Sequence, residues 1–197
     1  MRTASAVPGQ RFVVLDRTLV ERAQRGDRDA YEALVPGAAR RLYPVAHRIL
    51  RDPDQADDAV QLALVAIWRD LPSLREIDKF EAWTYRLVVR FSLAEGRRRR
   101  RVGVRSVRLG EITAESKDRI TEIDVRDQLD RAFEALSPEH RAVVVLHHYL
   151  GLSLGEVAEI TGVPYGTVGS RLHHATRALR AALDAGERPA VPEGQRA

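Results

Sequence analysis

The sequence predicts an all-α protein made of two small helical domains joined by a flexible linker. Apolar residues recur at helical spacing in the blocks 16–101 and 125–185. Between 102 and 124 this periodicity weakens, and glycine, serine and threonine punctuate the chain. The segments 1–15 and 186–197 contain proline and glycine and little periodicity, so we expect them to be flexible tails.

Three aspartates mark helix starts in the first block. Asp27, Asp52 and Asp78 each precede a helical pattern, and an aspartate there can accept a hydrogen bond from the free amides of a first turn. Each following stripe gives its helix one apolar face to bury. The stripe after Asp52 contains Val60, Leu64, Ile67 and Leu71, and the stripe after Asp78 contains Phe80, Trp83, Leu87, Phe91 and Ala94.

Prolines divide into two groups by position. Pro53 and Pro138 follow residues that cap helices, and proline suits the first position of a helix. Pro36 and Pro44 instead lie inside a helical pattern. Because proline removes a backbone donor and clashes with the preceding turn, we expect a kink or a break there.

The second block ends in the pattern of a helix-turn-helix. Ser153 and Glu156 form a capping box, and the turn 161–164 then separates a short helix from a longer one. The longer helix has an apolar face with Val168, Leu172, Ala175 and Leu179, and its other faces carry Thr167, Ser170, His174 and Arg177. Such a helix fits the major groove of DNA, although helical hairpins with a glycine turn also occur in proteins that do not bind DNA.

Basic residues point to a polyanionic partner. The chain has 32 Lys plus Arg, a net charge of +4 and an unbroken arginine run at 97–101. Trp83 and Tyr85 lie between these arginines and the start of their helix, beside Arg86 and Arg90, an arrangement that suits stacking on unpaired bases. The alternatives are a solvated basic helix end and a Trp83 that belongs to the core.

Several other functions are disfavoured. The acidic group at 52–58 lacks the glycine and glutamate of a calcium loop, because Asp57 and Ala63 occupy those positions. Adjacent histidines diverge by about 100° on a helix, and no catalytic triad or phosphate-binding glycine loop is present. We therefore expect no enzyme, metal or cofactor. The chain has no cysteine, no secretory leader and no apolar stretch of about 18 residues, which indicates a cytoplasmic protein.

Five motifs, in order along the chain, resemble the extracytoplasmic-function (ECF, group IV) sigma factors of the sigma-70 family. Three resemble parts of sigma region 2: RAQRGD with AYEAL (22–27, 30–34), DPDQADDAVQ with IWR (52–61, 67–69), and FEAWTYR (80–86). Two resemble sigma region 4: LSPEHRAV (136–143), and GVPYGTV with SRLH (162–168, 170–173). The resemblance covers nearly everything from Asp16 to Leu183.

The resemblance implies three binding surfaces and no catalytic residue. Contact with the β′ coiled coil of core RNA polymerase would involve Asp57, Asp58, Gln61 and Trp68. Recognition and melting of the −10 element would involve Ser73, Lys79, Trp83, Tyr85, Arg86, Arg90, Arg97, Arg98, Arg99 and Arg100. Recognition of the −35 element would involve Tyr165, Thr167, Ser170, Arg171, His174 and Arg177.

The resemblance also implies partners and a domain division. Region 2 would occupy 16–101, and region 4, at 125–185, would sit on the β flap. An anti-sigma factor would hold the protein inactive, and the promoters would belong to a restricted set of stress-response genes. Two rival functions are a helix-turn-helix regulator with a sensing or dimerisation domain, and a helical adaptor that binds polyanions.

The chain departs from the family pattern in both blocks. Members often carry a basic residue in place of Gly169 and arginines in place of His174 and Thr176, and Phe91 replaces a common asparagine. Each missing phosphate contact weakens DNA binding and flattens its salt dependence by about one unit of slope.

Overall fold

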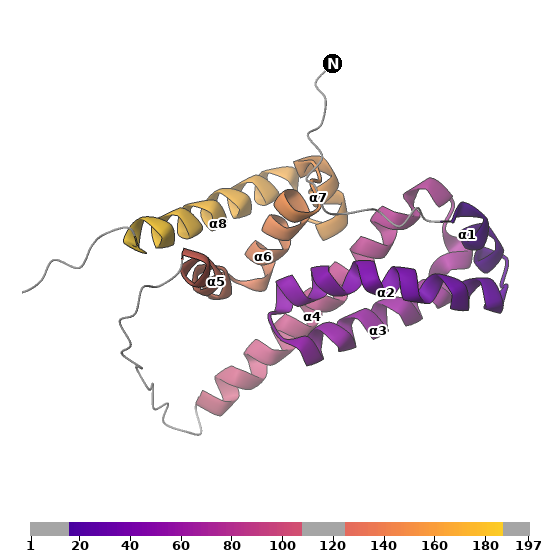
Figure 1. Ribbon diagram of the computed structural model, residues 1–197, viewed down its shortest axis with the longest axis horizontal. Coiled ribbons are helices and arrows are strands. Elements are labelled where there is room, and N and C mark those ends of the chain that lie inside the picture. The colour runs from indigo at the N-terminus through magenta and orange to yellow at the C-terminus, as the bar shows by residue number, and fades with distance from the viewer. Residues whose placement is uncertain (1–15, 108–124, 187–197) are drawn as a thin grey trace, which may run out of the picture.

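The computed structural model describes residues 16–107 and 125–186, which form an assembly of helices without strands (Figure 1). This confirms the predicted all-α fold. No described helix is both long and apolar enough to cross a membrane. The elements are α1 (Arg17–Gln24), α2 (Arg28–Leu50), α3 (Pro53–Asp70), η1 (Leu71–Ser73), η2 (Ile77–Lys79), α4 (Phe80–Val107), α5 (Val125–Ala135), α6 (Pro138–Val144), η3 (Val145–Tyr149), α7 (Leu154–Thr161) and α8 (Tyr165–Gly186).

Side-chain caps start several of these helices as the sequence predicts. Asp27, Asp52 and Ser153 each accept a hydrogen bond from the backbone amide three residues further on, at 3.0, 3.0 and 3.3 Å. The prediction for Asp78 is wrong, because this residue lies in the 3₁₀ turn η2 and pairs with Arg17 at 2.5 Å. α4 begins directly after that turn.

Helix α2 continues through both of its prolines, so the predicted break does not occur. Pro36 and Pro44 lie inside the unbroken helix. A proline leaves the carbonyl four residues earlier without its helical donor. Those carbonyls belong to Glu32 and Arg40, which are both exposed residues on the solvent side of the helix.

Helices α1 to α4 form one bundle, in which α2, α3 and α4 pack against one another and α1 covers one end (Figure 1). We call this set the N-terminal bundle. Apolar side chains from all four helices are buried inside it, and the largest include Leu42, Ile49, Ile67, Leu71 and Phe80. The stripe predicted on α3 is confirmed: Val60, Ile67 and Leu71 are buried, and Leu64 is partly buried against the core.

Helices α5 to α8 form the second set, which we call the C-terminal helices. α8 packs against α5, α6 and α7, and the buried Val168 and Ala175 lie on the predicted apolar face of α8. The turn between α7 and α8 depends on Gly162, whose φ of +69° is in the left-handed region that favours glycine. Its amide donates to the Ala158 carbonyl at 2.9 Å and closes α7.

The two sets of helices pack against each other. α6 and η3 contact α2, and α6 and α7 contact α4. α4 is consequently buried on more than one side, and its predicted stripe is only partly right: Phe80 and Leu87 are buried, but Ala94 is exposed while Val88 and Leu93 are buried. α4 also extends to Val107, past the predicted domain end at 101. The rest of the predicted linker, 108–124, and both predicted tails, except for Gly186 at the end of α8, lie outside the described residues.

Candidate polymerase and nucleic-acid interfaces

The outer face of α3 carries the residues predicted to contact polymerase. Asp57, Asp58 and Gln61 are all exposed, because the buried face of α3 is formed by alanines, Val60 and Ile67. Trp68 lies further along the helix and is 40% exposed. The structure therefore brings the four predicted residues to one side of a single helix.

Two exposed apolar residues on this side of α3 were not among the polymerase-binding residues predicted from the sequence. Leu62 is 50% exposed and Val65 is 64% exposed, and with Trp68 they follow the i, i+3 spacing that places residues on one helical face. The sequence does contain a signal for them, because these apolar residues lie outside the buried stripe of α3 and therefore have no place in its core. Because large apolar side chains grouped on a surface favour a protein partner, we count both among the candidate residues.

Trp68 is held in place by Tyr31 of α2. The two ring centroids are 4.7 Å apart at an interplanar angle of 52°. The Tyr31 hydroxyl donates a hydrogen bond of 2.6 Å to the Leu64 carbonyl on α3. Burial raises the pKa of Tyr31, so the hydroxyl keeps its donor proton at neutral pH. The contact with Tyr31 therefore restricts the Trp68 side chain before any partner binds.

The basic residues predicted for the −10 element lie along α4 and the turns before it. Arg86, Arg90 and residues 97–100 are exposed, and the Arg90 guanidinium lies 4.9 Å from the Phe91 ring centroid. Lys79 pairs with Glu76 at 2.9 Å, and the Ser73 hydroxyl donates to the Asp70 carbonyl at 2.6 Å. These residues run from the turns before α4 to Arg100, seven residues before the end of the helix at Val107.

Two of the arginines at 97–100 already pair with carboxylates of other helices. Arg99 Nη1 lies 2.5 Å from Asp52 Oδ2 on α3, and Arg100 Nη2 lies 2.8 Å from Glu139 Oε2 on α6. The Gln55 amide and then Arg99 hold the pKa of Asp52 below its ordinary value. Burial by itself would raise the pKa of Glu139, but the hydrogen bond and charge of Arg100, together with hydrogen bonds from the Glu139 amide and Ser137, outweigh it, and the net shift is downward.

The two aromatic residues predicted to meet unpaired bases lie differently. Trp83 is half-buried against Phe80, with ring centroids 6.0 Å apart. Tyr85 is only 7% exposed, and burial raises its pKa to about 12. It lines a cleft of about 260 Å³ shared by α4 and the segment that leads into α7, with Leu152 and Ile160 opposite. In this arrangement Tyr85 cannot reach a nucleic acid.

The predicted reading face of α8 is open. Tyr165, Ser170, His174 and Arg177 are exposed, while Thr167 and Arg171 are partly exposed. Tyr165, at the first position of α8, is 62% exposed. The opposite face holds Val168 and Ala175 in the core. The six predicted residues therefore occupy the part of α8 that points away from the protein.

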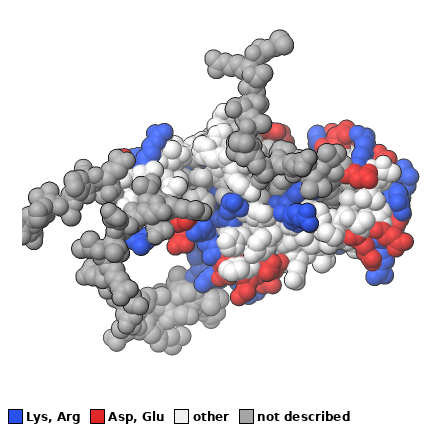
Figure 2. All heavy atoms as spheres, in the orientation of Figure 1, with Lys and Arg blue, Asp and Glu red and all other residues white. Residues whose placement is uncertain are grey.

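Acidic and basic side chains are interspersed over the visible surface. On the face shown in Figure 2, they alternate at the end of the N-terminal bundle that carries α1, without a broad patch of one sign. Between distant segments, Arg100 of α4 pairs with Glu139 of α6, and Arg51 after α2 pairs with Asp130 and Glu134 of α5. Local pairing, rather than net charge, therefore decides which arginines are available to a polyanion.

The chain matches two families in the predicted order. Residues 35–102 match sigma-70 region 2, and residues 126–179 match sigma-70 region 4. The ECF RNA polymerase sigma-E factor of Escherichia coli strain K12 is 31% identical over 177 residues, which are 83% of this chain and 92% of that protein. The ECF sigma factor SigW of Bacillus subtilis is 25% identical over 176 residues, covering 83% and 94%.

Solved structures agree with this assignment. CnrH, determined in complex with the cytosolic domain of CnrY, is 27% identical with a TM-score of 0.59, covering 87% of this chain and 98% of CnrH. The sigma factor RpoE of Bartonella quintana, determined with the anti-sigma factor NepR, has a TM-score of 0.60 at 24% identity, covering 82% and 99%, and supports the fold. The chain therefore belongs to the sigma-70 family as an ECF RNA polymerase sigma factor, a DNA-binding protein that directs promoter recognition and transcription initiation.

Proposed function

We propose that this sigma factor uses three separate surfaces to start transcription at a restricted set of stress-response promoters. The face of α3 binds the β′ coiled coil of core RNA polymerase, α4 and the segment 73–79 open the −10 element, and α8 reads the −35 element while region 4 sits on the β flap. The observation that carries the proposal is the presence of regions 2 and 4 in one chain, with the outer faces of α3 and α8 both exposed.

The α3 surface has the composition of a protein interface. Trp68, Leu62 and Val65 supply an apolar centre, and Asp57 and Asp58 supply charge beside it. A tryptophan fixed before binding loses little conformational entropy on docking, which makes it a suitable anchor. The carboxylates favour a basic partner surface and orient the encounter.

The −10 surface combines exposed cations with aromatic residues. Arg86 and Arg90 would hold phosphates of the non-template strand, and Trp83 would stack against a base at the edge of the melted region. Capture of an unpaired base by the segment 73–79 would drive strand opening without ATP. Tyr85 joins this surface only after the C-terminal helices have moved off α4, because it is buried beside them.

The −35 surface is one helix with a polar outer face. Thr167, Ser170 and Arg171 would reach base edges in the major groove, and Arg177 would hold a phosphate. Gly169 and Thr176 lack the positive charge common at those places, so we propose a weaker and less salt-dependent −35 contact than is usual.

Regulation by an anti-sigma factor is part of the proposal. CnrH was solved with the cytosolic domain of CnrY, and the Bartonella quintana RpoE was solved with the anti-sigma factor NepR. We propose that a comparable protein binds this chain in the cytoplasm, and that the chain has no catalytic activity of its own.

The proposal is tested by reconstitution with core RNA polymerase on a library of promoters. Run-off transcripts from a defined subset of promoters, absent with core enzyme alone, are the expected result. A helix-turn-helix regulator would instead bind duplex DNA as a free dimer, and a polyanion-binding adaptor would show no sequence preference. The proposal would be overturned if either of these binding behaviours were found and the protein gave no more transcripts than core enzyme alone.

Asp58→Arg tests the polymerase surface. The substitution places a cation beside the exposed Leu62, Val65 and Trp68 and reverses the charge that would meet core polymerase. We therefore expect the affinity for core polymerase to fall on the order of tenfold or more. A pull-down with core enzyme measures the loss, and far-UV circular dichroism checks the fold. Asp184→Arg, an exposed site near the end of α8 with the same charge change, is the matched control. Equal affinity of the Asp58 variant and the control would contradict the assignment.

A further inference from the structure

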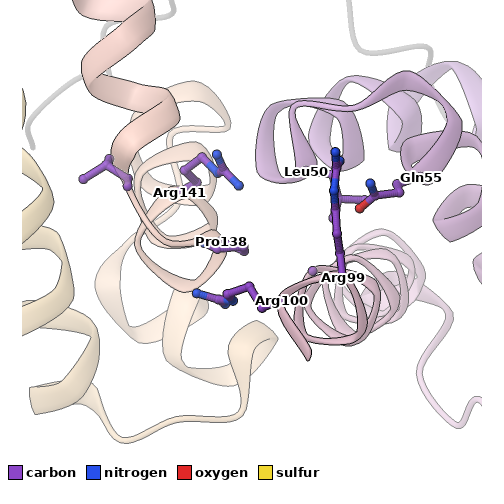
Figure 3. Close-up of a pocket in the computed structure, with 8 residues that line it drawn as sticks. Leu50, Gln55, Arg99, Arg100, Pro138 and Arg141 are labelled. Carbon is purple, nitrogen blue, oxygen red and sulfur yellow. The ribbon is translucent and has the colours of Figure 1, made fainter. Parts of the chain in front are cut away.

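A cleft of about 350 Å³ lies between α4, α6 and the junction of α2 with α3 (Figure 3). Its polar lining consists of Gln55 and the three arginines Arg99, Arg100 and Arg141, and none of the described residues that line it is acidic. A volume of this size lies within the range found for small-molecule sites. The cleft is therefore cationic and has room for a small ligand.

Arg141 is the most deeply placed of these arginines. It is only 8% exposed, and Figure 3 shows its guanidinium extending from α6 toward the cleft, on the side of Leu50. Its Nη1 donates to the Glu134 carbonyl at 3.3 Å, but its Nε has no hydrogen-bond partner in the described structure. Buried charges in proteins are normally paired, and a buried donor without a partner points to a missing ion or water. Arg141 therefore lacks an anionic partner among the residues that the structure describes.

The carboxylates beside the cleft are already engaged by the other two arginines. Arg99 pairs with Asp52, and Arg100 donates to both carboxylate oxygens of Glu139 at 2.8 and 3.1 Å. Three guanidiniums thus meet two carboxylates, and the third guanidinium belongs to Arg141. Burial, followed by the charges of two neighbouring arginines, lowers the pKa of Arg141 although nearby carboxylates act in the opposite sense. Because arginine stays protonated in proteins, the excess positive charge can be balanced only by an anion.

The geometry favours phosphate groups as that anion. A guanidinium pairs with phosphate through two parallel N–H···O bonds, and the oxygens of one phosphate point in several directions. Arg100 comes from α4 and Arg141 from α6, so a phosphate between them can bind both walls of the cleft (Figure 3). The volume equals that of roughly ten water molecules, which leaves room for a second, linked phosphate. Segments on several sides bound the cleft, which suits a small anion better than a strand of DNA.

We propose that this cleft binds a small anion with linked phosphate groups, held chiefly by Arg141 and Arg100, with Arg99 at its edge. The anion supplies the counter-charge that Arg141 lacks and joins α4 to α6 through one ligand. Pyrophosphate and the diphosphate of a nucleotide share this chemistry. The inference goes beyond the proposed function, because it assigns an effector site rather than a surface for polymerase or promoter DNA, and it holds or fails independently of transcription.

Isothermal titration calorimetry of the full chain with pyrophosphate tests the site, in a buffer without phosphate and at fixed ionic strength. We expect saturable binding of one pyrophosphate per chain, and weaker binding of inorganic phosphate. Adenosine diphosphate distinguishes the two sources: tighter binding than pyrophosphate indicates a nucleotide, and weaker binding indicates the free anion. Heat that does not saturate would show only a general attraction to basic surface and would overturn the proposal. A short DNA single strand that alone binds in an Arg141-dependent way would overturn it too.

Arg141→Gln removes the charge that the anion would balance. We expect the affinity for pyrophosphate to fall about tenfold or more, because a buried charge pair loses one partner. Arg180→Gln makes the same charge change at an exposed position of α8 and should alter the affinity less than about twofold. Far-UV circular dichroism checks that both variants are folded. Equal losses in the two variants would show that the anion does not bind in this cleft.

Glu139→Gln tests the site in the opposite direction. It removes the carboxylate that holds Arg100, so this guanidinium becomes available and the affinity for pyrophosphate should rise severalfold. A damaged fold cannot produce such a gain. Asp184→Asn removes the same charge at an exposed position near the end of α8 and should give a smaller increase. Equal increases would mean that net charge, rather than the release of Arg100, is responsible, and would count decisively against the proposed site.

Discussion

At the scale of single residues, neighbours decide what a side chain can do. Tyr85 follows Trp83 in an arginine-rich helix, and on sequence alone it is a candidate for stacking on bases. In the structure, Tyr85 is buried beside Leu152 and Ile160, which are more than sixty positions away in the chain. Trp68 shows the reverse: it remains exposed, but the Tyr31 ring fixes its position.

Tyr85→Phe tests the burial of this phenol. Burial raises its pKa to about 12, against about 10 in the unfolded chain. Between these values the unfolded state ionises first, so the stability due to Tyr85 is present below pH 10 and is lost as pH rises toward 12. Phenylalanine cannot ionise. Urea titrations from pH 8 to 11.5 should therefore show a shallower fall in the variant, by up to about 1.4 kcal/mol per pH unit. Parallel curves would contradict the burial.

At the scale of elements, short helices depend on their ends. α7 has few residues with which to propagate a helix, and it is closed by a capping box at Ser153 and by Gly162 at its other end. The Ser153 backbone and hydroxyl both donate to Glu156 Oε2, at 2.8 and 2.7 Å. The hydroxyl of Ser153, followed by its backbone amide, lowers the pKa of Glu156. These caps set the position of the turn that precedes α8.

Ser153→Ala should destabilise region 4 by about 1 kcal/mol, because the amide of Glu156 loses its acceptor at the start of α7. Urea unfolding followed by circular dichroism measures this loss. Ser153→Thr restores a hydroxyl at the same place and should recover most of it. A loss that threonine does not recover would mean that the capping hydroxyl is not the cause.

At the scale of the whole molecule, regions 2 and 4 share one continuous apolar core. Buried residues of the N-terminal bundle, such as Val89, and of α6 and α7, such as Val143 and Val157, belong to the same cluster. Residues that share a core tend to unfold together. The described regions should therefore behave as a single cooperative unit while docked.

Both tryptophans, Trp68 and Trp83, lie in the N-terminal bundle, so tryptophan fluorescence reports the unfolding of that bundle, whereas circular dichroism reports all helices. If the two sets of helices unfold together, fluorescence and circular dichroism should give coincident urea transitions for the wild-type protein. In Glu139→Arg, loss of the docked contact should let the C-terminal helices unfold first, and the dichroism transition should precede the fluorescence transition. Asp184→Arg should keep them coincident. Separate transitions in the wild type would contradict docking in solution.

The sequence by itself determined the helices, the caps at Asp27, Asp52 and Ser153, the buried face of α8 and the family. These depend on spacing and on hydrogen bonds between residues close in the chain, which a sequence displays directly. It also indicated the four α3 residues whose exposure the structure shows, because an amphipathic helix fixes its own outer face.

Only the tertiary structure decided which of the predicted −10 residues are accessible. The burial of Tyr85, the pairing of Arg100 with Glu139 and the close approach of Pro138 to Gly96 all arise from the packing of α6 and α7 on α4. The physical reason is that burial and pairing depend on which distant segments meet. A second packed face on α4 adds apolar positions outside its main stripe, and the local periodicity cannot assign them to a partner.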